Sequence, residues 1–189
     1  MRSNIFLCGV VGFIVVLGLA VGSANAKLSK SAYQIYQQAN MAECKGDIQG
    51  AVDLINKAIS TNSEEDVMLY TKLGGLYVTL EKYDEALEIY KKAVALRYTD
   101  AFLYVSLGNI YQVKGDNINA LVSYQKALEL CPEYKYNYLN VANVELALKH
   151  YSEAEDNYKK FLESYPENYD AIANFVVILL INVSQIPPP

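Results

Sequence analysis

The chain has 189 residues, which is enough for one domain of ordinary size, and its 16 basic and 21 acidic residues give a formal net charge of −5. A net negative surface repels phosphate backbones, so the composition argues against nucleic-acid binding. Tyrosine is unusually frequent, with 17 copies, whereas tryptophan is absent. These tyrosines recur at a fixed interval, as described below.

Residues 1–26 have the layout of a secretory signal peptide. One positive charge, Arg2, precedes an almost purely apolar run from Ile5 to Val21, and Ala24-Asn25-Ala26 forms an A-x-A cleavage pattern. The alternative is an uncleaved membrane anchor over residues 5–22, because such a run is nearly long enough to cross a bilayer. We therefore expect an exported protein, either periplasmic or secreted, or else membrane-anchored. Residues 27–31 form a short lead-in.

A repeat of 34 residues follows. Leu107-Gly108, Tyr111, Ala120 and Tyr124 have counterparts 34 residues upstream and, in part, 34 residues downstream. A more degenerate copy precedes them, separated by one extra residue. Four units are thus predicted, and period and spacing together make this a strong signal. Their bounds are 32–65, 67–100, 101–134 and 135–168.

Each unit is expected to form a helix, a turn and a second helix. In the third unit, small and apolar residues recur at i, i+3, i+4 and i+7 on both sides of a turn at Gly115-Asp116-Asn117, and Pro132 ends the second helix. Gly108, Ala120 and Ala127 are small because two antiparallel backbones must approach closely there. A single pair cannot bury its apolar faces, so the copies must stack.

These units resemble the tetratricopeptide repeat (TPR) family, and the resemblance covers residues 32–181. It implies an all-α fold: a right-handed α-solenoid of four helix-turn-helix units plus a fifth, C-terminal helix. The family's usual tryptophan is replaced here by Ile35, Tyr70, Tyr104 and Tyr138. The first unit is degenerate, and the fourth carries Glu145 where two others have tyrosine.

The resemblance also implies that a peptide lies in the concave groove, against the first helix of each unit. The implied groove residues are aromatic, apolar or amide-bearing and almost uncharged. They are Tyr33, Tyr36, Asn40, Met68, Thr71, Phe102, Val105, Asn109, Gln112, Tyr136, Leu139 and Asn143.

Asn40, Asn109 and Asn143 occupy the same place in three units, and Gly75 occupies it in the other. Side-chain amides both donate and accept hydrogen bonds, so such a row can pair with an extended peptide backbone of any sequence. The alternative is that these three side chains are merely solvated.

Some family members bind the C-terminal carboxylate of heat-shock chaperones through a cationic clamp. The places of the clamp are held here by Tyr36, Asn40, Lys72, Phe102 and Ser106, of which only Asn40 matches in type. The sequence therefore argues against this activity.

The predicted C-terminal capping helix, residues 169–183, is apolar nearly all round. Ile172, Phe175, Val176 and Leu179 would hold the packing places, which leaves Val177 and three further apolar residues outward. A terminal helix should instead be polar on its outer face. We therefore expect self-association, as a homodimer, through Ile178, Leu180 and Ile181. Residues 184–189 form a proline-rich tail.

No catalytic or metal-binding pattern is present in the sequence. His150 is the only histidine and falls in a predicted turn, without a serine or cysteine motif beside it. No His, Cys and carboxylate cluster has metal spacing, and Gly74-Gly75 falls inside a helix, not in a phosphate-binding loop. We therefore expect no enzyme, no cofactor and no metal.

Two functions remain. The first is an exported adaptor or scaffold that binds peptide segments of other proteins in its groove. The second is a structural subunit of an envelope or secretion assembly, which docks or self-associates through the C-terminal helix. No nucleic acid is expected as a partner, and a membrane only through an uncleaved N-terminal segment.

Overall fold

A computed structural model describes residues 28–62 and 65–184, and the predicted signal peptide lies outside them. Within these ranges the chain forms nine α-helices and no strand, as the repeat predicts. The chain divides into two compact units, Met1–Leu80 and Glu81–Pro189, which are described separately.

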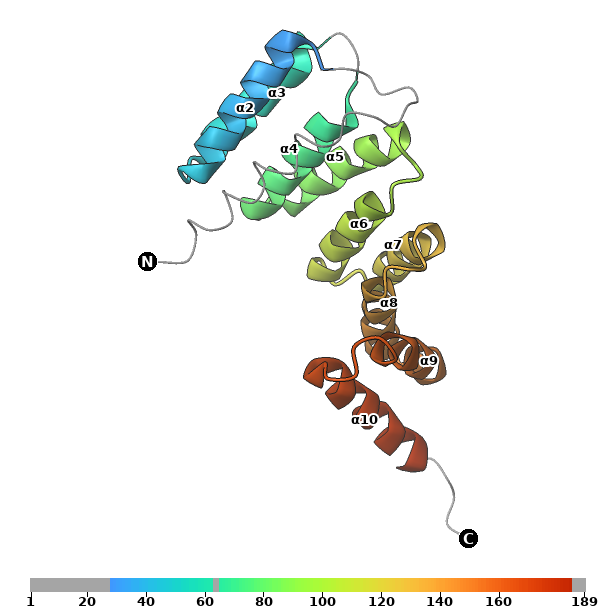
Figure 1. Cartoon of the computed structure of the whole chain (residues 1–189). Coiled ribbons are helices and arrows are strands. Elements are labelled where there is room, and N and C mark those ends of the chain that lie inside the picture. Colours follow the sequence, from blue (N-terminus) through green and yellow to red (C-terminus); the bar gives the residue numbers. More distant parts are fainter. Residues whose placement is uncertain (1–27, 63–64, 185–189) are drawn as a thin grey trace. The chain divides into compact units, whose positions relative to one another are not determined.

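Unit 1 contains α2 (Lys30–Cys44), α3 (Ile48–Thr61) and α4 (Val67–Thr79). Helices α2 and α3 form a closely packed pair, and α4 packs against α3 (Figure 1). Alanine and isoleucine fill the interface, because Ala39, Ala51, Ile55 and Ala58 are all fully buried.

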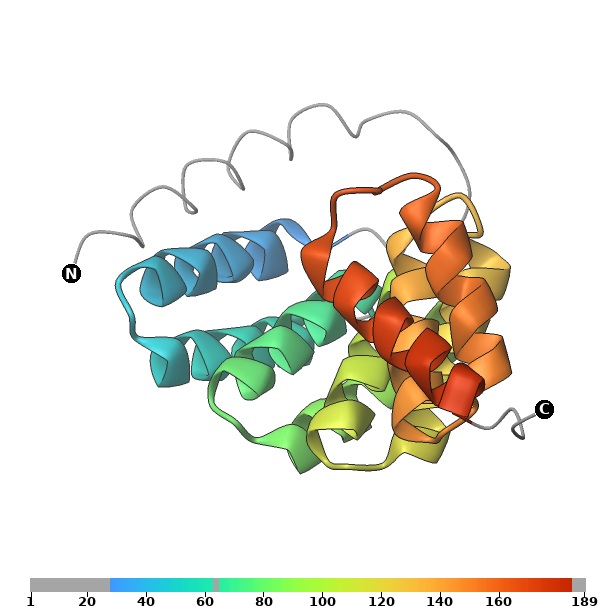
Figure 2. The same ribbon diagram turned by 90° about the horizontal axis from the view of Figure 1, so that it is seen from below.

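Unit 2 contains six helices. Each packs against the next in chain order, and Figure 2 shows α10 lying along the α8–α9 pair. The bounds are α5 (Tyr83–Leu96), α6 (Ala101–Val113), α7 (Asn117–Leu130), α8 (Tyr136–Ala147), α9 (Tyr151–Leu162) and α10 (Tyr169–Ser184).

Aspartate starts several helices in both units. The side chains of Asp47, Asp66, Asp100 and Asp116 each accept a hydrogen bond from a backbone N–H in the first turn of the following helix. Such caps satisfy donors that the helix itself leaves unpaired. The turn within a repeat also needs a left-handed residue, which is Gly115 in the third repeat (φ 75°) but Lys149 in the fourth (φ 63°).

Close backbone approach decides the packing of each helix pair in unit 2. A Cβ atom added to Gly108 of α6 would lie 2.5 Å from Cε1 of Tyr124, whose ring is buried in α7. Ala120 and Ala127 on α7 have no exposed surface. A small residue on one helix therefore faces a large ring on the other, as the spacing predicts.

The fourth repeat departs from this apolar pattern at Glu145 of α8. Its side chain is only 4% exposed, and one carboxylate oxygen accepts a hydrogen bond of 2.8 Å from Nδ2 of Asn157. Burial, followed by smaller effects that include the neighbouring charge of Glu153, raises the pKa of Glu145 above its ordinary value of 4.5.

Replacing Gly108 with alanine should destabilise the protein by about 1–3 kcal/mol, because the new methyl group overlaps a buried ring that has no free space beside it. Urea unfolding of the full chain measures this loss. A Tyr124→Leu variant is the control, because its smaller side chain removes the overlap. The two substitutions together should cost less than the sum of their separate effects. A Gly108→Ala chain as stable as the parent would contradict the packing.

Replacing Glu145 with glutamine should stabilise the protein at neutral pH. The raised pKa means that folding favours the protonated carboxyl, so the ionised form opposes folding as the pH rises above 4.5. Glutamine keeps the shape and removes the charge. The gain in unfolding free energy should therefore be present at about pH 7 and vanish below about pH 4. The exposed Glu163→Gln variant serves as the control, and equal effects of both variants at every pH would refute the prediction.

Candidate functional site

All twelve predicted groove residues lie on the first helices of the repeats, and none of them is buried. Five lie in unit 1, on α2 and α4, and seven lie in unit 2, on α6 and α8. We call the latter seven the first-helix face of unit 2. It consists of Phe102, Val105, Asn109, Gln112, Tyr136, Leu139 and Asn143.

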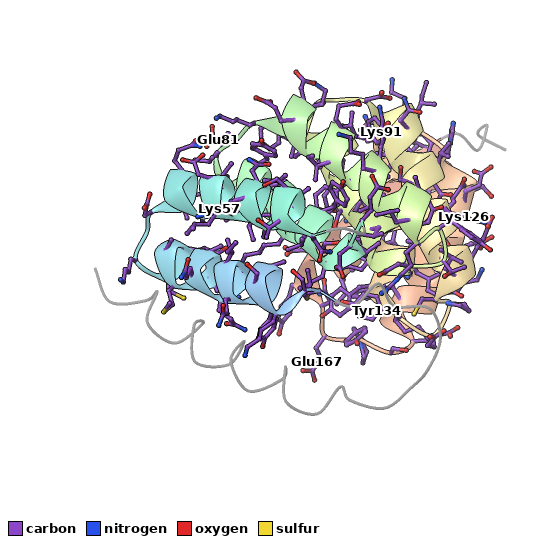
Figure 3. The ribbon with its side chains drawn as sticks, turned by 90° about the horizontal axis from the view of Figure 1, so that it is seen from above. Lys57, Glu81, Lys91, Lys126, Tyr134 and Glu167 are labelled. Atoms are coloured by element: carbon purple, nitrogen blue, oxygen red, sulfur yellow. The ribbon has the colours of Figure 1, made fainter. Side chains whose placement is uncertain are left out.

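Charge is separated between first and second helices. Helix α6 contains no charged residue, and the only one on α8 is the buried Glu145. Helices α5, α7 and α9 carry the acidic and basic residues of this unit, and Figure 3 shows Lys91 of α5 and Lys126 of α7 on its outside. In unit 1, Lys72 of α4 is paired with Glu43 of α2. The first-helix face of unit 2 is therefore polar and aromatic but uncharged.

Two of the three asparagines of the predicted row are bound to buried tyrosines. The Tyr124 hydroxyl donates to Oδ1 of Asn109 at 2.6 Å, and the Tyr158 hydroxyl donates to Oδ1 of Asn143, also at 2.6 Å. Both tyrosines lie 15 residues after their asparagine, so the third and fourth repeats use the same contact. Burial raises the pKa of Tyr124 to about 12, so this phenol stays protonated and can donate at neutral pH.

The other repeats lack this contact. Fifteen residues after Asn40 stands Ile55, which has no hydroxyl, and fifteen residues before Tyr90 stands Gly75, which has no amide. The predicted row therefore has two tyrosine-bound members and one, Asn40, of a different kind. Sequence reasoning treated the tyrosines only as large packing residues. The recurring 15-residue spacing between asparagine and tyrosine was the signal that it missed.

Val105 and Leu139 have a second role. Both are partly buried and pack against the two cores of unit 2. Phe102, at 60% exposed, and Tyr136 are the most accessible large side chains of the first-helix face. The aromatic residues and the amides therefore offer most of its contact surface.

Tyr136 also belongs to an exposed aromatic cluster that the sequence did not indicate. Its ring lies 5.7 Å from that of Tyr134 and 5.0 Å from that of Tyr165, measured between centroids, and buried Phe161 lies beneath at 5.3 Å. The cluster joins the loop before α8 to the loop after α9. It extends the aromatic surface beyond the end of α8.

The places of the cationic clamp are unsuited to binding a carboxylate. The ammonium group of Lys72 is paired with Glu43. Ser106 is buried, and its hydroxyl donates to the carbonyl oxygen of Phe102 at 3.0 Å. Neither group is available as the clamp would require.

The prediction for the C-terminal helix is wrong at Ile178. This residue has no exposed surface, because α10 packs Ala171, Phe175 and Ile178 onto the core of the fourth repeat. Extending the repeat register had placed Ile172 inward instead, which rotates the helix by one residue. Leu180 is 64% exposed, as expected, and Ile181 is half-buried. The exposed face of α10 consists of Val176, Val177, Leu179, Leu180 and Val183.

Within residues 28–62 and 65–184, no group of three or more His, Cys, Asp or Glu residues is arranged to hold a metal ion. None of the helices in these ranges has the length and apolar character needed to cross a membrane.

Comparison with known proteins identifies the repeats. The family model described as the tetratricopeptide repeat matches residues 69–100 and 103–134. No curated protein sequence matches the chain.

Solved structures share the fold. A MamA structure has a TM-score of 0.73 at 23% identity, covering 79% of this chain and 81% of that one. YrrB, described as a TPR protein with an unusual peptide-binding site, has a TM-score of 0.71 at 22% identity, covering 82% and 79%. The first TPR of Spaghetti, bound to an HSP90 peptide, has a TM-score of 0.59 at 23% identity, covering 62% and 93%. The chain therefore has the helical-repeat fold of TPR proteins.

Proposed function

We propose that the tetratricopeptide repeats of this chain form a non-enzymatic module that binds peptide segments of partner proteins along the first helices. The observation that carries the proposal is the first-helix face of unit 2, which is accessible and free of charge on both of its helices. Two of the similar structures are described as having a peptide-binding site or a bound peptide, which supports this choice.

The chemistry of this face suits an extended peptide. Exposed rings such as Phe102 and Tyr136 provide large contact area at a small entropic cost. Asn109, Gln112 and Asn143 add hydrogen-bonding groups whose use does not depend on the charge of the partner. We therefore expect binding that is mostly insensitive to salt and is selective for apolar and aromatic side chains.

We further propose that the protein acts outside the cytoplasm, as an adaptor or scaffold. This part rests on the signal-like sequence of residues 1–26.

A double substitution, Asn109→Ala with Asn143→Ala, should weaken peptide binding tenfold or more, because each asparagine loses a hydrogen bond to the ligand. The ligand is selected from a random peptide library displayed on phage, and calorimetry then measures its affinity for the full chain.

The control for this experiment is Gln125→Ala, an exposed amide on the second helix α7. This variant should bind like the parent. Unchanged affinity in the double variant would rule out the amides as the binding site.

A second candidate function follows from α10, which we propose to pair with α10 of a second copy. Its exposed face carries five aliphatic side chains and no charge, so nothing on it repels an identical face. Val176 stands where the third and fourth repeats have Gly108 and Ala142. A second helix in the usual repeat position needs a small residue there. The face therefore fits a partner at wider spacing, such as another α10.

Introducing glutamate at both Leu180 and Val183 should convert such a dimer to a monomer, because two buried carboxylates would face their own copies. Light scattering at increasing concentration measures the change. Both positions are 64% exposed, so folding should be unaffected, whereas a charge at Ile178 would disrupt the core. A parent chain that is monomeric at high concentration would exclude this function.

A further inference from the structure

We infer that Tyr124 and Tyr158 determine the orientation of the Asn109 and Asn143 amides, so that the first-helix face of unit 2 offers N–H donors and selects backbone carbonyl oxygens of an extended peptide. This inference deepens the proposed peptide binding and rests on it. Its basis is the pair of tyrosine-to-asparagine hydrogen bonds in the third and fourth repeats.

The fourth repeat defines the orientation most clearly. Oδ1 of Asn143 accepts from the Tyr158 hydroxyl at 2.6 Å and, more weakly, from Nδ2 of Asn174 on α10 at 3.4 Å. Two donors thus converge on the carbonyl end of one amide. A flipped Asn143 would bring its own NH₂ group against these donors. The NH₂ group therefore occupies the opposite branch of the planar amide.

In the third repeat, one hydroxyl lies near two amides. The Tyr124 oxygen is 2.6 Å from Oδ1 of Asn109 and 3.0 Å from Oε1 of Gln112. A phenol has a single proton to donate, and the shorter contact with Asn109 takes it. Asn109 is therefore held with its carbonyl toward the tyrosine. Gln112 can satisfy the same oxygen only by turning its NH₂ group toward it.

Core packing holds each hydroxyl in place. Tyr124 and Tyr158 are at most 1% exposed, so their rings cannot follow a rotating amide. The residue just before each asparagine is small, Gly108 in one repeat and Ala142 in the other, and the ring of Tyr124 passes directly against Gly108. The arrangement that closes the helix pair therefore also places a hydroxyl beneath the asparagine.

The consequence is a choice of ligand chemistry. With their carbonyl oxygens occupied, Asn109 and Asn143 can offer only NH₂ donors to a partner. Backbone carbonyls present acceptors whatever the peptide sequence, and acidic side chains present them only at particular residues. Because backbone carbonyls recur along any extended chain, they are the acceptors that two asparagines at the same repeat position would meet.

The test replaces both tyrosines by phenylalanine, which keeps the ring and removes the hydroxyl. The matched control is Tyr90→Phe: Tyr90 is also buried, at 5% exposed, and its hydroxyl is hydrogen-bonded to Ser106 instead of an asparagine. The ligand is a phage-selected peptide, resynthesised with single ester linkages in place of amides. An ester weakens the carbonyl acceptor at one position.

For the parent chain and for Tyr90→Phe, esters at two positions of the peptide should each weaken binding by about tenfold. In the Tyr124→Phe/Tyr158→Phe chain, the unmodified peptide should bind at least threefold more weakly, and the ester effects should shrink to about twofold. Thermal unfolding confirms that each variant is folded. A purely structural role of the hydroxyls would leave the ester profile unchanged, and that result overturns the inference.

Two further outcomes separate this inference from the proposed function. If Asn109→Ala/Asn143→Ala weakens binding but the phenylalanine variants keep the parent ester profile, only the inference fails. If the asparagine substitutions have no effect either, the first-helix face is not the peptide site and both fail. Loss of binding on replacing acidic peptide residues by their amides, with no ester effect, would show that carboxylates are the acceptors and would also overturn it.

Discussion

The close approach of two antiparallel helix backbones is the constraint on which the third and fourth repeats depend. A glycine or alanine on one helix leaves room for a large ring on the other, and Gly108 against Tyr124 shows how little space remains. Because such a pair buries only part of its apolar surface, the next pair must cover the rest. The repeat spacing, the consecutive contacts of α5 to α10 and the position of the buried tyrosines all follow from this one requirement.

The same constraint frees the remaining faces for other uses. Packing needs only one stripe of α6 and α8, so the side chains beside that stripe are not fixed by stability. They are uncharged here, whereas the second helices α5, α7 and α9 carry the charges. Charged second helices interact favourably with water and favour solubility. Uncharged first helices can be covered by a partner without the cost of removing ions from water.

The repeat could be read from the sequence because its period comes from residue size, which the sequence states directly. Orientation was harder to predict. The register of α10 was misjudged at Ile178 because no following unit fixes which stripe packs, and Ala171 and Phe175 make an equally good one. The role of the Tyr124 and Tyr158 hydroxyls was missed because tyrosine and phenylalanine are nearly equal as packing residues. Only coordinates reveal the atom that a hydroxyl meets.

Two departures from the repeat pattern fall in the same helix pair. Lys149 takes a left-handed conformation that glycine adopts at no cost in the third repeat, and Glu145 is buried with a single hydrogen-bond partner two helical turns from the aromatic cluster's helix start. In an array whose members contact only their neighbours, each pair can open almost independently. The α8–α9 pair is therefore the weakest link of unit 2, and local unfolding would begin there. Such an opening would expose Asn143 and release α10, so that the ligand site and the terminal helix would respond together to a change in the stability of one repeat.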